Sequence, residues 1–162
     1  MLESATTEHE RTEEVLEIYK LLVEMADRVS QRRQSANSFY LTVNTAIIGA
    51  TAYVARDTDG ANTWAISLAG VAICILWIRA VLSYKSLNSA KFKVITELEG
   101  RLPVAAFKDE WEFLQGANGK RHTPFHKTEV LVPFVFISVH SAQFASTLPW
   151  QAIWEAGKLA LC

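Results

Sequence analysis

His140 is the ionisable side chain that lies deepest in an apolar segment of this 162-residue chain. It falls within residues 130–154, a run of 25 positions without Asp, Glu, Lys or Arg. An ionisable group at membrane depth predicts a functional site. A neutral imidazole can also hydrogen-bond a neighbouring helix with no further role. Both interpretations of His140 stay open on the sequence alone.

The other groups that could do chemistry do not form a recognised site. The two cysteines, Cys74 and Cys162, are far apart, in neither a disulfide framework nor a zinc pattern. The seven glycines include no nucleotide-binding loop, and no serine-hydrolase or HExxH motif is present. We therefore expect no cofactor and no metal ion. The net charge of −1 also gives no reason to expect a nucleic-acid partner.

One short motif, "RHTPFH", raises the question of catalysis. Its Arg121-x4-His126 spacing is similar to the ribonuclease motif of HEPN domains, in which Arg and His share a helix. Pro124 lies between the two residues and disfavours a helix through that point. The alternative is a basic loop beside anionic lipid headgroups. We expect the protein not to be an enzyme.

Three uncharged segments are long enough to cross a bilayer, which takes about 20 mostly apolar residues. They contain 22, 19 and 25 residues, and half of the whole chain is apolar. The fold class expected is an all-α membrane protein with transmembrane helices at about 36–55, 62–78 and 130–148. Pro149 ends the third span, and Trp150 and Trp154 suggest a short amphipathic helix at the membrane surface. Trp64 and Trp77 fall near the two ends of the second span, where aromatic rings prefer the interface.

The basic residues predict the orientation, because Lys and Arg concentrate on the cytoplasmic side of a membrane. Ten of them flank one side of the spans, whereas Arg56 and Lys158 flank the other. This predicts a multi-pass protein with a cytoplasmic N-terminus and an external C-terminus. The ten are Arg28, Arg32, Arg33, Arg79, Lys85, Lys91, Lys93, Lys120, Arg121 and Lys127.

The cytoplasmic part is expected to be helical and continuous with the spans. Residues 8–36 form one amphipathic helix, and residues 79–128 contain a helical exit from the second span followed by a loop. The apolar seam is Val15, Ile18, Leu22, Met25 and Val29, widened by Leu16, Tyr19 and Val23. Glu97 and Glu99 fit a solvated face better than a pair of catalytic acids. The two extensions are expected to form an antiparallel hairpin, with residues 1–162 as a single membrane domain.

The first span has polar side chains on one half and apolar ones on the other. Ser38, Thr42, Thr45, Gly49 and Ala52 share one face, and Asn37, Asn44 and Thr51 form an adjacent stripe. A lone anchor in lipid would gain nothing from these residues. They can form a tight helix–helix seam or line an aqueous path, and both need neighbouring helices. Self-assembly is therefore expected, with Asn37, Ser38, Thr42, Asn44, Thr45 and Thr51 at an interface or pore.

Four blocks in this order resemble the RipA family of small octameric bacterial membrane proteins. They are "YKLLVEMADRVSQRRQSANSFYLTVNTAII", "ILWIRAVLSYKSLNSAKFKVITELEGRLP", "EWEFL" and "PFHKTEVLVPFVFI", and "LNSAKFKVITELEGRLP" is the most specific part. The resemblance covers roughly residues 19–140. It implies a homo-oligomer, an octamer, in the bacterial cytoplasmic (inner) membrane. More loosely, the plan is similar to small membrane effectors of antiphage systems.

Two functions follow as hypotheses. In the first, subunits surround a pore or channel-like path, with Arg28, Arg32 and Arg33 as rings at its cytoplasmic mouth. In the second, the assembly is a non-conducting scaffold or adaptor that docks a soluble cytoplasmic partner. The partners expected are the chain itself, the lipid bilayer and, in the second case, that cytoplasmic protein.

Overall fold

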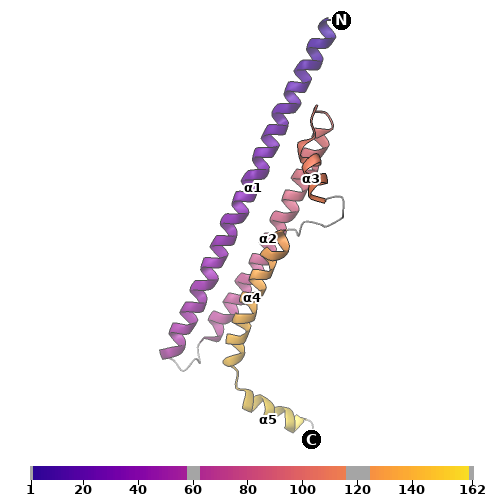
Figure 1. Cartoon of the computed structure of the whole chain (residues 1–162). Coiled ribbons are helices and arrows are strands. Elements are labelled where there is room, and N and C mark those ends of the chain that lie inside the picture. The colour runs from indigo at the N-terminus through magenta and orange to yellow at the C-terminus, as the bar shows by residue number, and fades with distance from the viewer. Residues whose placement is uncertain (1, 58–62, 116–124, 161–162) are drawn as a thin grey trace. The chain divides into compact units, whose positions relative to one another are not determined.

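The computed structural model describes residues 2–57, 63–115 and 125–160, and these residues form five helices and no strand. Figure 1 shows α1 (Leu2–Asp57), α2 (Trp64–Glu99), α3 (Ala106–Gln115), α4 (Phe125–Ser146) and α5 (Trp150–Ala160). The predicted all-α fold is confirmed for this part of the chain.

Three of these helices, α1, α2 and α4, are long and apolar enough to cross a membrane. The prediction of three spans is confirmed, with small shifts at the ends. α2 begins at Trp64 rather than at residue 62, and α4 ends at Ser146 rather than at 148. α4 ends early because Pro149 follows, and proline disfavours the helical conformation of the residue before it.

α1 and α2 also continue beyond their spans, as expected. No glycine or proline occurs between residues 2 and 48, so nothing in the sequence interrupts α1 before the middle of its span. α2 ends at Glu99, immediately before Gly100. The chain divides into two compact units. The flanking unit contains residues 1–37 and 79–129, and the span unit contains residues 38–78 and 130–162.

In the flanking unit, α1 and α2 form the predicted antiparallel hairpin (Figure 1). Ala26, Val29, Val81 and Ile95 are its buried apolar residues. α3 packs against both helices through one aromatic side chain. The ring of Phe107 lies 6.4 Å from that of Tyr19 and 5.4 Å from that of Phe92.

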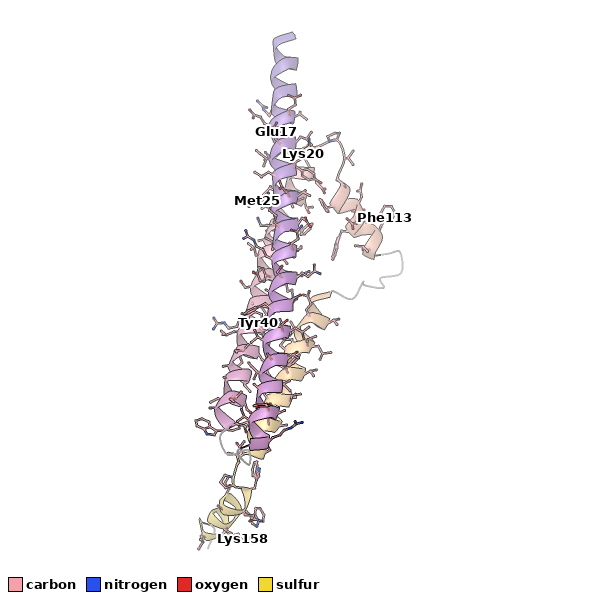
Figure 2. The ribbon with its side chains drawn as sticks, turned by 90° about the vertical axis from the view of Figure 1, so that its left-hand side faces the viewer. Glu17, Lys20, Met25, Tyr40, Phe113 and Lys158 are labelled. Carbon is pink, nitrogen blue, oxygen red and sulfur yellow. The ribbon has the colours of Figure 1, made fainter. Side chains whose placement is uncertain are left out.

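The predicted apolar seam of α1 differs from the observed one. Val29 is buried, but Ile18 and Met25 are 51% and 41% exposed, and Ala26 takes the buried position. Figure 2 shows Met25 on the surface of α1. The sequence pattern reflects every apolar contact of α1, both those within one chain and those with other copies of the chain. It therefore also included residues that are exposed in a single chain. A single chain uses only part of that face.

In the span unit, an aromatic layer joins three helices. The ring of Tyr40 on α1 stacks on that of Trp77 on α2, with 5.8 Å between the ring centroids. The ring of Phe136 on α4 lies 6.1 Å from that of Trp77. Trp77 is buried and Trp64 is exposed, and the expected place of both rings near the membrane surface stays a prediction. α5 carries Trp150 and Trp154, both exposed, and is the short helix predicted after Pro149.

Candidate functional site

Three polar side chains meet in the middle of the span unit, one from each spanning helix. Asn44 of α1, Cys74 of α2 and His140 of α4 are all fully buried. The Sγ atom of Cys74 lies 2.9 Å from Oδ1 of Asn44, and Nε2 of His140 lies 3.1 Å from the same oxygen. We call these residues the span cluster. It joins the three helices through one amide oxygen.

The backbone fixes which atoms of the span cluster donate. Nδ2 of Asn44 donates to the carbonyl oxygen of Tyr40 at 2.8 Å, an oxygen that can only accept. Oδ1 of Asn44 therefore faces Cys74 and His140. Since this oxygen can only accept, the Cys74 thiol and Nε2–H of His140 are the donors. The imidazole tautomer that fits this arrangement carries its proton on Nε2.

The imidazole of His140 lies directly against the backbone of α2. A Cβ placed on Gly70 would come 2.5 Å from Cε1, 2.6 Å from Nδ1 and 2.7 Å from Cγ of that ring. Only glycine leaves room for such an approach. The Nδ1 atom of His140 is buried and has no hydrogen-bond partner among the described residues. Among the described residues, the cluster is a packed helix junction whose three side chains are closed to water.

The structure separates the polar residues of the first span into two groups. Asn44 and Thr51 are buried within the chain, and their expected place at a pore or subunit interface stays a prediction. Asn37 is half-buried and donates to Oε1 of Glu129 at 3.5 Å. The other stripe stays on the surface. Its exposed members are Ser38, Thr42, Thr45, Gly49 and Ala52.

The three arginines expected at the cytoplasmic mouth have different surroundings. Arg28 forms an exposed ion pair with Glu24 at 2.6 Å. Arg33 lies 3.6 Å from Glu129 of α4, and its side chain is largely covered. Arg32 is exposed and makes no ion pair with the part of the chain that the structure describes. The three side chains are therefore not equivalent within one chain, and the rings expected at the cytoplasmic mouth stay a prediction.

Glu99 is buried, although the sequence analysis expected it on a solvated face. Glu97 is exposed as expected, but Glu99 is only 1% exposed. Its carboxylate accepts hydrogen bonds from the Tyr19 hydroxyl at 3.0 Å and from the backbone N–H groups of Phe107 and Lys108 at 2.8 and 3.1 Å. Burial, followed by the hydrogen bond and charge of Glu99, raises the pKa of Tyr19 to about 12.

These bonds make Glu99 the N-terminal cap of α3. The helix begins at Ala106, and Asp109 N–H bonds to the carbonyl of Ala105. Ala105 therefore occupies the cap position but has no side-chain oxygen. Glu99 supplies that oxygen from the end of α2. The absence of Ser, Thr, Asp or Asn before "AFKDEW" was the sequence signal that a more distant acceptor is needed.

The expectation that Arg121 and His126 do not form a catalytic pair stays a prediction. Arg121 lies outside the described residues, and α4 begins at Phe125, directly after Pro124. Within the described ranges, no group of three or more His, Cys, Asp or Glu side chains could hold a metal ion.

These features define an all-α membrane protein with three spanning helices and a helical hairpin outside the spans. The chain belongs to the octameric membrane protein family (8xMP), which it matches over residues 16–149. Neither the curated proteins nor the solved structures provide a match. Membership in this family means that the chain self-associates. The exposed apolar and small-polar faces of one chain are therefore available to its copies.

Proposed function

We propose that the octamer encloses a pore or channel-like path across a bacterial inner membrane, with the N-terminus in the cytoplasm. The likeness to RipA proteins and the looser one to antiphage membrane effectors support this assignment, and the excess of Lys and Arg on one side supports the orientation. The observation that carries the proposal is the exposed small-polar stripe of α1 in a chain whose family is octameric.

The described part of the chain leaves this stripe uncovered. The hydroxyls of Thr42 and Thr45 donate to the carbonyls of Ser38 and Leu41 at 2.9 Å. Each hydroxyl can still accept a hydrogen bond, from water or from another helix. A Cβ on Gly49 would meet nothing within 4 Å, so packing inside the chain does not require glycine there. These properties fit a wall that faces the axis of an assembly.

Cysteine accessibility tests which half of α1 faces water. In a Cys162→Ser background, Thr45→Cys should react with a charged, water-soluble thiol reagent, whereas Ala46→Cys should not. Ala46 is the matched control because it is at the same depth and also exposed in the single chain, but lies on the apolar half of the helix.

Ion flux tests the pore directly. The double variant Thr42→Leu with Thr45→Leu should lower ion flux through the purified octamer in liposomes several-fold. Equal labelling at positions 45 and 46, together with no ion flux under any condition, would rule out the pore hypothesis.

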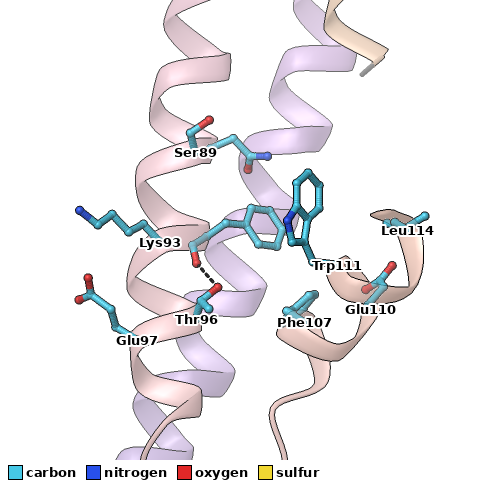
Figure 3. Close-up of a pocket in the computed structure, with 10 residues that line it drawn as sticks. Ser89, Lys93, Thr96, Glu97, Phe107, Glu110, Trp111 and Leu114 are labelled. Carbon is cyan, nitrogen blue, oxygen red and sulfur yellow. Dashed lines mark hydrogen bonds between the residues drawn. The ribbon is translucent and has the colours of Figure 1, made fainter. Parts of the chain in front are cut away.

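A groove between α2 and α3 favours the second candidate, a scaffold that docks a soluble protein. It has a volume of about 910 Å³. Figure 3 shows Phe107, Trp111 and Leu114 of α3 along it, opposite Ser89 and Thr96 of α2. Trp111 is 56% exposed, which is unusual for a side chain of this size and typical of contact surfaces. An apolar segment of a partner would fit here.

A change at Trp111 separates docking from permeation. A photo-crosslinking residue at position 111 should capture the partner in cells, and Trp111→Ala should abolish co-purification without changing the octamer. Phe113→Ala is the control, since Phe113 is also on α3 and projects into solvent, outside the groove (Figure 2). If Trp111→Ala and Phe113→Ala behave alike, the groove is not the docking site.

A further inference from the structure

A second hollow of the flanking unit is lined almost entirely by hydrogen-bond donors. It has a volume of about 480 Å³. Five of its residues recur at helical spacing along one face of α1, and one comes from α2. None of the lining residues is acidic. They are Arg28, Gln31, Arg32, Ser35, Ala36 and Tyr84.

The positive charge of this hollow is only partly neutralised. Arg28 is paired with Glu24, but both side chains are more than half exposed, at 66% and 57%. Such exposed pairs contribute little to stability, so a stronger anion can replace Glu24. Gln31 donates to Asp27 at 2.8 Å. The guanidinium of Arg32 has no carboxylate partner within residues that the structure describes.

The predicted start of the first span places the hollow at the level of the lipid phosphates. At about 1.5 Å per residue, Arg32 is about 6 Å and Arg28 about 12 Å before the predicted start of the first span at residue 36. The headgroup layer on each side of a bilayer is about 5–8 Å thick. Ser35 and Arg32 therefore fall inside this layer, and the long side chain of Arg28 reaches it. Tyr84, with an apolar ring and a polar tip, is a residue type typical of this zone.

We propose that this hollow binds the phosphate of an anionic phospholipid. Arg32 is the principal ligand, since its planar guanidinium can give two parallel hydrogen bonds to phosphate oxygens. Arg28 provides a second charge, and Ser35 and Tyr84 provide hydroxyl donors. Basic pockets beside spanning helices on the cytoplasmic side are suited to such headgroups. Each subunit would carry one such site, which would anchor the octamer in a membrane rich in anionic lipid.

The test measures lipid retention by the intact octamer with native mass spectrometry. Phosphatidylglycerol, phosphatidylcholine and inorganic phosphate are titrated separately onto wild type, Arg32→Gln and Arg79→Gln. Arg79 is the matched control because it is an exposed arginine at the same end of the spans, outside the hollow. Arg32→Gln should weaken phosphatidylglycerol binding about tenfold, as the loss of one charge-assisted contact predicts. Arg79→Gln should leave it unchanged, and Arg32→Lys should give an intermediate value.

Three outcomes would overturn the proposal. Equal binding by Arg32→Gln and Arg79→Gln would show that the hollow does not hold lipid. Inorganic phosphate that binds as tightly as phosphatidylglycerol would assign the site to a soluble anion. If Arg32→Gln dissociates the octamer without changing lipid retention per chain, the hollow receives a carboxylate from a neighbouring subunit. Size-exclusion chromatography of each variant distinguishes the last case.

Discussion

Gly70→Ala is expected to destabilise the span unit by about 1–3 kcal/mol, the usual cost of forcing extra volume into a packed interior. Without the neighbouring ring, alanine would be the better helix former at this position by about 1 kcal/mol. Here alanine is instead expected to lower the stability, because its Cβ would lie 2.5–2.7 Å from three atoms of the His140 imidazole. That ring cannot move aside without breaking its bond to Asn44. The measurement is the midpoint of thermal unfolding in detergent, followed by tryptophan fluorescence.

A double-mutant cycle isolates the cause of this effect. In a His140→Ala background the ring is absent, so Gly70→Ala should cost little or nothing. The same penalty in both backgrounds would show that Gly70 is needed for another reason. Gly49→Ala is a useful companion, because its Cβ meets nothing within 4 Å of the chain. Any loss of stability there would therefore report a neighbouring subunit, and not the packing inside one chain.

The elements of this fold were predictable because the bilayer places strong demands on sequence. A spanning helix needs about 20 residues with few charges, and three segments meet this requirement. The continuation of α1 and α2 followed from the absence of Gly and Pro, and Gly100 marked the end of α2. These are local properties, each visible in a short window. They predicted the helices well, with errors of only a few residues at the ends.

The site was less predictable because it depends on helix rotation. The polar half of the first span was recognised, but not which stripe faces its own chain. Asn44 turns inward because Cys74 and His140 supply donors at the same depth, and Thr45, the next residue, points outward. Residues on three separate helices decide this, and no pattern within one helix reveals them. An isolated ionisable residue in one span and an Asn in another were the available signals.

The same reason explains the different positions of Glu97 and Glu99. Two residues along a helix differ by about 200°, so one of the two must face away when the other faces the core. Which one is buried depends on the backbone N–H groups of α3, which need an acceptor because Ala105 offers none. The missing cap residue before α3 indicates that a nearby carboxylate caps the helix. It does not indicate whether that carboxylate is Glu97 or Glu99.

Glu99→Ala is therefore expected to release α3 from the flanking unit. It would leave the Tyr19 hydroxyl and two backbone N–H groups without an acceptor. Hydrogen bonds to a charged group contribute about 1.5–3 kcal/mol each, and they are not additive, so we expect a loss of about 3 kcal/mol. The negative charge also favours the N-terminus of α3 through the helix dipole. Hydrogen exchange should show the loss as faster exchange in residues 106–115.

Glu97→Ala is the matched control, because Glu97 lies on the same helix two residues away and is exposed. It should leave exchange in α3 unchanged. Equal protection of α3 in Glu99→Ala and Glu97→Ala would refute the capping role. Glu99→Gln keeps an acceptor oxygen but removes the charge, so it should give an intermediate effect.

The ionisation of Tyr19 gives a second readout of the same contact. Its pKa is raised from 10.0 to about 12, first by burial and then by the hydrogen bond and charge of Glu99. A raised pKa means that the folded state favours the neutral phenol, so this contribution is complete below pH 10 and is lost as the pH rises toward 12. Glu99→Gln should move the pKa of Tyr19 back toward 10, but only in part, because burial remains the largest cause. The phenolate absorbance, taken as the difference from a Tyr19→Phe variant, measures this shift. An unchanged value in Glu99→Gln would mean that burial alone raises it.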